Sequence, residues 1–103
     1  MLTQPVSAYI LPQSAERRLT EADLEGLSHQ QLCLARNEIY ARHGRRFKNK
    51  DIAAYFAEKD WYYPSIDASV FDANQNSYLS EDELYNATFM LEYEKRKFGK
   101  SYY

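Results

Sequence analysis

Three segments of the chain share one pattern of apolar and polar residues, and this pattern is typical of the start of a helix. Each segment reads Leu, then Ser or Thr, two further residues, a polar residue and a second Leu; the segments begin at Leu19, Leu27 and Leu79. The hydroxyl can accept a backbone N–H of the first turn, and the side chain of the polar residue can accept the backbone N–H of the Ser or Thr. The two leucines can contact each other across the turn. The pattern predicts helices over about 20–26, 28–43 and 80–98, closed by Gly26, Gly44 and Gly99.

The rest of the chain has weaker patterns. Asn49 as a cap and apolar residues on one side predict a further helix over roughly 50–59. Residues 61–78 contain Pro64 and many turn formers and predict a long ordered loop, whereas the first 18 residues predict an extended segment. No stretch alternates as a strand does, so we expect a mainly α, small single-domain bundle of about four helices. Its expected parts are a flexible N-terminal segment (1–8), the helical domain (9–99) and a C-terminal tail (100–103).

Composition narrows the class of protein. The 103 residues include ten tyrosines and carry a net charge of −2, which argues against a nucleic-acid partner. The single cysteine, Cys33, excludes an intrachain disulfide and a cysteine-based zinc cluster. No apolar run reaches the ~18 residues that a membrane span needs, and residues 1–13 lack the basic head of a signal peptide. We expect membrane attachment only through an anchor that this chain does not contain.

The predicted 28–43 helix places charged residues on its apolar face. Counted at about 100° per residue from Leu32, the side chains of Arg36, Tyr40 and His43 lie within about 80° of the apolar stripe. They could form a polar pocket for an anionic or sugar ligand. They could instead form a buried network in which Arg36 meets a carboxylate. The candidate carboxylates for that network are Asp23, Asp60, Asp67 and Asp72.

The outer face and the end of the same helix are also charged. Glu38 lies at about 240° on the same count, so we expect it to point outward and to pair with Arg42, four residues on. A basic segment follows, made of Arg42, Arg45, Arg46, Lys48 and Lys50. It could be an electrostatic footprint for an anionic cell-wall polymer, lipid headgroups or nucleic acid. It could equally be a solvated helix end whose cations complement the helix dipole.

Aromatic residues offer two further candidate surfaces. Trp61 and Tyr62 could stack on sugar rings, although a lone Trp in a small domain is typically a core residue. In the predicted 80–98 helix, Tyr85, Phe89 and Tyr93 form a second apolar row beside the core stripe. We therefore expect that helix to pack against the core on one face and against either the N-terminal segment or a partner chain on another.

Catalytic and metal sites are weakly indicated. Cys33 and His43 are ten positions apart on one helix, about 15 Å along its axis, which is too far for a nucleophile pair. A hydrolase that uses His43 with a carboxylate stays open as an alternative, but we expect no enzyme and no cofactor. Residues 72–83 resemble a calcium loop that lacks the usual glycine and the entering helix. Its ligands would be Asp72, Asn74, Asn76, Tyr78, Ser80 and Glu83.

Residues 37–44, which read Asn-Glu-Ile-Tyr-Ala-Arg-His-Gly, and the nearby Phe47 resemble the signature of the YARHG domain, a bacterial module named for five of these letters. Further matches in order run from Tyr9-Ile10-Leu11-Pro12 to Leu79-Ser80-Glu81, so the resemblance covers about residues 9–98. It implies a presumed extracellular module, often attached to a membrane anchor or other envelope-associated segments. It carries over no catalytic residues and no established biochemical role.

We therefore expect a non-enzymatic binding module at the bacterial cell surface, whose ligand could be a cell-wall glycan or another envelope component such as a protein. The alternative is a structural or protein-interaction domain in which the motif only builds the core. An open cleft beside Arg36 and His43 would favour the first, and full burial and pairing of both would favour the second. The candidate binding residues are Arg36, Asn37, Tyr40, Arg42, His43, Arg45, Arg46, Trp61 and Tyr62.

Overall fold

The computed structural model describes residues 9–103, and this part of the chain is helical, without a β-strand. The elements are the 3₁₀ helix η1 (Pro12–Ala15) and helices α1 (Glu21–Leu24), α2 (His29–Ala41), α3 (Lys50–Ala57), α4 (Ala68–Ala73), α5 (Gln75–Tyr78) and α6 (Glu81–Phe98). One isolated parallel bridge joins Arg45 to Ile66. The expected mainly α class is confirmed, whereas the expected flexible segment 1–8 lies outside the described residues.

The three predicted helix starts are confirmed as capping boxes. The side chain three positions after each cap accepts the N–H of the capping residue, at 2.7 Å for Thr20, 2.9 Å for Ser28 and 3.0 Å for Ser80. The predicted cap of α3 is also present, because Asn49 Oδ1 accepts the N–H groups of residues 51 and 52. These contacts satisfy donors that have no partner inside the helix. The local sequence therefore determines where α1, α2, α3 and α6 begin.

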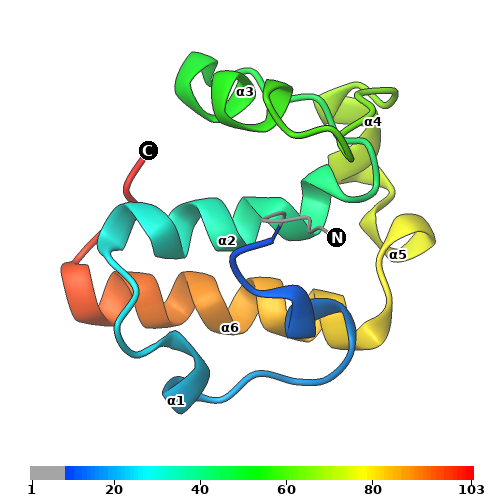
Figure 1. Cartoon of the computed structure of the whole chain (residues 1–103). Helices are drawn as coiled ribbons and strands as arrows, with labels where there is room; N and C mark the ends of the chain where they lie inside the picture. The colour runs from blue at the N-terminus through cyan, green and yellow to red at the C-terminus, as the bar shows by residue number, and fades with distance from the viewer. Residues whose placement is uncertain (1–8) are drawn as a thin grey trace, which may run out of the picture.

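Helices α2 and α6 lie side by side at the centre of the molecule, and α3 and α4 lie on the opposite side of α2 from α6 (Figure 1). The main core fills the contact between α2, α6 and the segments around them. Its fully buried members include Leu24, Leu32, Ile39, Phe71 and Met90. A second cluster surrounds Phe56 of α3 and contains Trp61 and Tyr62. Helix α2 therefore contributes to two cores, which explains why residues on most of its circumference are buried.

The expected outward position of Glu38 is wrong. Its side chain is 0% exposed and accepts the N–H of Ile10, at 3.0 and 2.9 Å, and that of Leu11, at 3.1 Å. Residues 9–19, called the N-terminal segment from here on, thus cover the face of α2 that the helical wheel places outside. A buried carboxylate needs such donors, and burial raises the pKa of Glu38 against the opposing effect of these hydrogen bonds.

A second buried polar side chain holds the same segment on α6. Asn86 is 0% exposed; its Oδ1 accepts the N–H of Leu19 at 2.8 Å, and its Nδ2 donates to the carbonyls of Ser14 and Arg17 at 2.9 and 2.8 Å. The backbone N–H and C=O groups of a segment outside helices and strands need other hydrogen-bonding partners, such as side chains. The described part of the expected extended segment, residues 9–18, therefore follows a fixed path across both central helices and includes the helical turn η1.

The expected long loop over residues 61–78 is only partly correct. Helices α4 and α5 occupy most of its second half, because Phe71 is fully buried and stacks on the ring of Tyr78, with ring centroids 4.9 Å apart. The residues of the predicted second apolar row of α6 differ in exposure. Tyr93 is buried, whereas Tyr85 is 40% exposed beneath the guanidinium of Arg18, 4.4 Å from its ring centroid. The N-terminal segment therefore contacts this row through Arg18.

Candidate functional site

The motif at residues 40–44 ends α2 and ties that end to other parts of the fold. Tyr40 contacts the ring of Phe71 in α4 edge to face, with centroids 5.9 Å apart. Arg42 donates from Nη2 to the Oγ of Ser14 in η1 and lies over the ring of Tyr9, 5.1 Å from its centroid. Arg42 was expected to pair with Glu38. It instead contacts the fully buried Ser14 and so holds the N-terminal segment on α2.

The last two motif residues connect α2 to α6 and to the segment before α4. His43 Nε2 lies 3.0 Å from both carboxylate oxygens of Glu83, in the first turn of α6. Gly44 has φ +90° and its carbonyl accepts the N–H of Ser65 at 2.9 Å and of Ile66 at 3.0 Å. Only glycine adopts this φ without steric cost. The motif therefore works as a junction between separate segments of the chain.

Arg36 points toward α6, as predicted, but the predicted aspartate partners are wrong. Its Nη2 lies 3.5 Å from Glu94 Oε1 and 3.6 Å from Cys33 Sγ. The Arg36 side chain is only 13% exposed, and its Nε is buried without a hydrogen-bond partner among the described residues. These long contacts use little of the five-donor capacity of a guanidinium. Three of the four predicted partners pair with other arginines, Asp23 with Arg17, Asp67 with Arg46 and Asp72 with Arg45.

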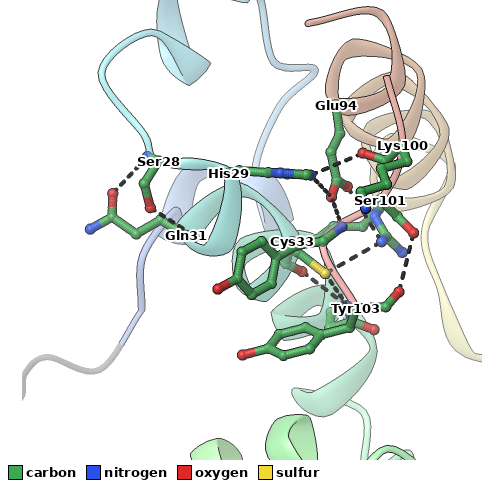
Figure 2. Close-up of polar contacts among 11 residues, drawn as sticks. Ser28, His29, Gln31, Cys33, Glu94, Lys100, Ser101 and Tyr103 are labelled. Atoms are coloured by element: carbon green, nitrogen blue, oxygen red, sulfur yellow. Dashed lines mark hydrogen bonds and ion pairs between the residues drawn. The ribbon is translucent and has the colours of Figure 1, made fainter. Parts of the chain in front are cut away.

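Glu94 is fully buried and holds the C-terminal residues against the domain (Figure 2). Its Oε2 accepts the N–H of Tyr102 at 2.6 Å and lies 3.1 Å from His29 Nε2. The same nitrogen of His29 lies 2.9 Å from the carbonyl of Lys100, and its ring stacks on Phe98 with centroids 4.3 Å apart. A buried carboxylate is tolerated where several donors converge on it. The expected tail 100–103 is thus packed on α2 and α6.

Cys33 lies beneath this tail. Its side chain is 1% exposed, and Figure 2 shows its sulfur close to the backbone of Tyr103. Burial raises the pKa of the Cys33 thiol, although the Arg36 charge and backbone donors of Tyr102 and Tyr103 act in the opposite direction. The thiolate is the reactive form of cysteine, so the raised pKa and the burial both favour an unreactive thiol.

Two of the five cations of the basic segment, Arg45 and Arg46, form ion pairs with carboxylates. Arg45 donates from Nε and Nη2 to the two carboxylate oxygens of Asp72, each at 2.9 Å, and this contact lowers the pKa of Asp72. Arg46 donates to Asp67 at 2.9 Å. The hydroxyl of Tyr62 donates to the Arg45 carbonyl at 2.6 Å. These contacts fix the backbone and the guanidinium groups that follow the motif.

Trp61, the other aromatic candidate for sugar binding, packs inside the fold. Its ring is half-buried and contacts the ring of Phe56, with centroids 6.0 Å apart, and that of Tyr9, with centroids 4.9 Å apart. Both contacts are edge to face, which is a favourable arrangement for aromatic pairs. The N-terminal segment thus also contacts the second core.

A surface cleft of about 460 Å³ lies beside the motif. It is lined by residues of α2, of the segment after it, of α3 and α4 and of the tail; the charged and polar ones include Arg36, Asn37, Arg45, Lys48, Asp72 and Tyr103. We name it the basic cleft, because its walls carry three cations and one carboxylate, and that carboxylate is already paired with Arg45. Three of the nine candidate binding residues line it. The other six are placed elsewhere, namely Tyr40, Arg42, His43, Arg46, Trp61 and Tyr62.

The weak calcium candidate does not fold as a loop. Helices α4 and α5 occupy residues 72–78, Asp72 is bound by Arg45, and Glu83 both contacts His43 and completes the cap of α6. Within residues 9–103, no group of three or more His, Cys, Asp or Glu side chains is placed to hold a metal ion. The two carboxylates of the candidate loop therefore make structural contacts.

Two residues of this region, Glu94 and Tyr103, were not predicted from the sequence. Glu94 lies at about 280° from Leu84 on the helical wheel of α6, next to the core stripe, so the wheel contained a signal for its burial. Tyr103 follows the last predicted helix, and no local pattern indicates that it lines a cleft.

These features define a small all-α domain in which two central helices fix both terminal segments and a basic cleft opens beside the motif. The chain matches the family model of the YARHG domain over residues 7–95, which is most of its length, and it therefore belongs to the YARHG domain family. Comparisons with curated proteins and with solved structures gave no match. Among the helices of residues 9–103, none combines the length and apolar character needed to cross a membrane.

Proposed function

We propose that this domain is a non-enzymatic binding module of the bacterial cell envelope, and that its basic cleft receives an anionic group of a cell-wall polymer or another envelope component. The observation that carries the proposal is the charge of the cleft, whose lining includes three cationic side chains and one carboxylate. Arg45 is paired with that carboxylate, and Arg36 lies 3.5 Å from buried Glu94. A carboxylate or phosphate group matches such a set of donors.

The arrangement of the cations favours recognition over a merely solvated surface. Arg45 is held by two hydrogen bonds to Asp72 and is only 18% exposed, so its guanidinium is already oriented. Arg36, 13% exposed, and the exposed Lys48 add two further positive charges to the walls of the cleft. Partial burial strengthens electrostatic attraction relative to open water. A preorganised guanidinium also loses less conformational freedom when a ligand binds.

The competing proposal is a structural or protein-interaction domain whose motif only builds the core. The contacts of Arg42 with Ser14 and of His43 with Glu83 favour a structural role for the motif itself. A hydrolase that uses His43 with Glu83 has less support, because the same carboxylate accepts the N–H of Ser80 at the start of α6. The binding proposal therefore depends on the cleft, and variants of the residues that line the cleft test it.

The test is co-sedimentation of the protein with insoluble peptidoglycan, prepared with and without its attached phosphate-rich polymers. The informative variant is Lys48→Glu, and Lys50→Glu is the matched control. It makes the same charge change two residues away, outside the basic cleft. We expect the wild type and Lys50→Glu to sediment and Lys48→Glu to stay in solution. No binding by the wild type, or equal binding by both variants, would overturn the proposal.

The salt dependence of the same assay gives a second readout. Binding through ionic contacts weakens as salt rises, because exposed charges are screened over about 10 Å at 0.1 M salt. Loss of sedimentation between low and high salt for the wild type is expected. Binding that is insensitive to salt would contradict an anionic ligand in the basic cleft.

A further inference from the structure

A second cleft shares Tyr103 with the basic cleft. Its volume is about 620 Å³, and α2, α3 and the tail line it. We name it the tyrosine cleft, after the three tyrosines among its polar lining residues, which are Gln30, Asp51, Tyr55, Glu58, Tyr102 and Tyr103. Tyr103 lines both clefts, so the tyrosine cleft and the basic cleft share this residue.

The two clefts differ in the sign of their charge. The charged residues that line the tyrosine cleft are Asp51 in the first turn of α3 and Glu58 directly after that helix, both exposed, and no Lys or Arg joins them. Across Tyr103, the basic cleft carries three cations and one paired carboxylate. A ligand that spans Tyr103 thus meets negative charge on one side and positive charge on the other.

The tyrosines are arranged as a binding surface for a cation. Gln30 Nε2 donates to the hydroxyl of Tyr103 at 2.8 Å, and the rings of Tyr102 and Tyr103 meet edge to face, with centroids 4.8 Å apart. The N–H of Tyr102 is held by buried Glu94. These contacts fix the rings before any ligand arrives, which lowers the entropic cost of binding.

An ammonium group of this chain already uses one of these rings. The Nζ of Lys59 lies 4.5 Å from the centroid of the Tyr55 ring, although Lys59 is outside the walls of the cleft. Aromatic faces attract cations within about 6 Å, and nearby carboxylates reinforce the attraction. The tyrosine cleft thus brings together tyrosine rings and carboxylates, the groups that recognise an organic cation, while Lys59 occupies one face of Tyr55.

We propose that the tyrosine cleft binds an alkylammonium group, and that the domain recognises a ligand carrying both an ammonium and a carboxylate or phosphate, seated on opposite sides of Tyr103. The ligand class is a zwitterionic one, with the ammonium and the anionic group on the same molecule. The ammonium site stands on the tyrosine cleft alone, whereas the two-charge ligand rests on the proposed function of the basic cleft.

The test is titration of the ¹⁵N-labelled protein, followed by amide chemical shifts, with three related probes. Nα-acetyl-lysine amide carries the ammonium alone, Nα,Nε-diacetyl-lysine carries the carboxylate alone, and Nα-acetyl-lysine carries both. We expect the first to shift the amides of Tyr55, Tyr102 and Tyr103, the second to shift those of Arg45 and Lys48, and the third to shift both sets. The third should bind about tenfold more tightly than either single-charge probe, because its second contact is intramolecular.

Matched variants separate the ammonium site from general charge effects. Glu58→Gln should weaken the ammonium-only probe by about two- to fivefold, as the loss of one exposed attraction implies. Glu92→Gln removes the same charge from the exposed side of α6, away from either cleft, and should leave the affinity unchanged. Equal weakening by both variants would contradict the site.

The outcomes distinguish the two proposals. If the ammonium-only probe leaves the amides of the tyrosine cleft unshifted while the carboxylate-only probe shifts those of Lys48, the ammonium site is overturned and the basic cleft stands. If only the ammonium probe binds, the basic-cleft proposal fails and the two-charge ligand fails with it. If both single-charge probes bind but the double probe binds no more tightly, the two clefts act independently and the zwitterionic ligand is wrong.

Discussion

Substitution of Gly44 by alanine should destabilise the fold far more than the same change at Gly26, although both glycines have nearly the same backbone conformation. Gly44 has φ +90° and Gly26 has φ +87°. A Cβ at Gly44 would lie 2.6 Å from Ser65 Oγ and 3.1 Å from the Tyr63 carbonyl oxygen, whereas a Cβ at Gly26 meets nothing within 4 Å. The pair therefore separates backbone strain from steric conflict.

The expected magnitudes follow from these two terms. Placing an alanine in the left-handed region costs about 1–2 kcal/mol, and this cost applies to both positions. At Gly44 the hydroxyl of Ser65 can rotate away, but the Tyr63 carbonyl belongs to the backbone and must shift. Overpacking of this kind adds about 1–3 kcal/mol. We expect a total loss of about 2–5 kcal/mol for Gly44→Ala and about 1–2 kcal/mol for Gly26→Ala.

The assay is urea denaturation followed by circular dichroism, with the free energy of unfolding extrapolated to water. The double variant Gly44→Ala/Ser65→Ala removes the hydroxyl nearest to the new Cβ and should recover part of the loss. Equal losses for Gly44→Ala and Gly26→Ala would refute the reasoning. That result would show that the motif glycine is required for its φ alone and not for the close approach to residues 63 and 65.

Three further predictions concern the buried groups. Burial raises the folded-state pKa of Glu38 above its unfolded value, so its ionised form opposes folding at neutral pH. The stability of the wild type relative to Glu38→Gln should therefore increase as the pH falls from neutral through that raised pKa; an increase toward higher pH would contradict this cause. Glu94→Ala should lower the free energy of unfolding by about 3–5 kcal/mol in urea titrations, because it leaves Arg36 and His29 without their buried carboxylate; a loss below about 1 kcal/mol would contradict a buried ionic contact. Deleting residues 101–103 should speed alkylation of Cys33 by iodoacetamide about tenfold or more, measured by mass spectrometry of the native protein; an unchanged rate would show that the tail does not protect the thiol.

Local patterns predicted most of the helices. The cap and leucine pattern at Ser28 and Ser80 was sufficient because a capping box is an interaction between residues three apart, and the chain itself supplies both partners. The helices within residues 68–78 were not predicted, because their apolar contacts are made with distant segments. Phe71, for example, is buried against residues of other elements, which no local window contains.

The candidate site was predicted less completely, for a physical reason. A helical wheel identifies the face with the most apolar residues, but it cannot show that a second segment covers the opposite face. Glu38 appeared to be outside for this reason, and the segment around Ile10 is what buries it. The inward direction of Arg36 was correct because it depends on helix geometry alone, whereas its partner Glu94 depends on how α2 and α6 pack.

The polar residues of the core serve the irregular segments. Glu38, Asn86 and Glu94 are each fully buried, and each accepts backbone N–H groups from a terminal segment. Such contacts satisfy backbone groups that neither a helix nor a strand could pair. The two terminal segments therefore belong to the fold, and the C-terminal one contributes Tyr103 to both clefts.

The central claim is that the motif builds the fold and that the adjacent basic cleft binds the ligand. The most direct test measures peptidoglycan binding and urea stability on the same samples of Lys48→Glu and His43→Gln. We predict that Lys48→Glu keeps its stability and loses binding. We predict that His43→Gln loses about 1–3 kcal/mol, because the buried Glu83 keeps the N–H of Ser80 but loses its contact with the imidazole, yet binds normally while folded. Normal binding by Lys48→Glu, or loss of binding by fully folded His43→Gln, would contradict the claim.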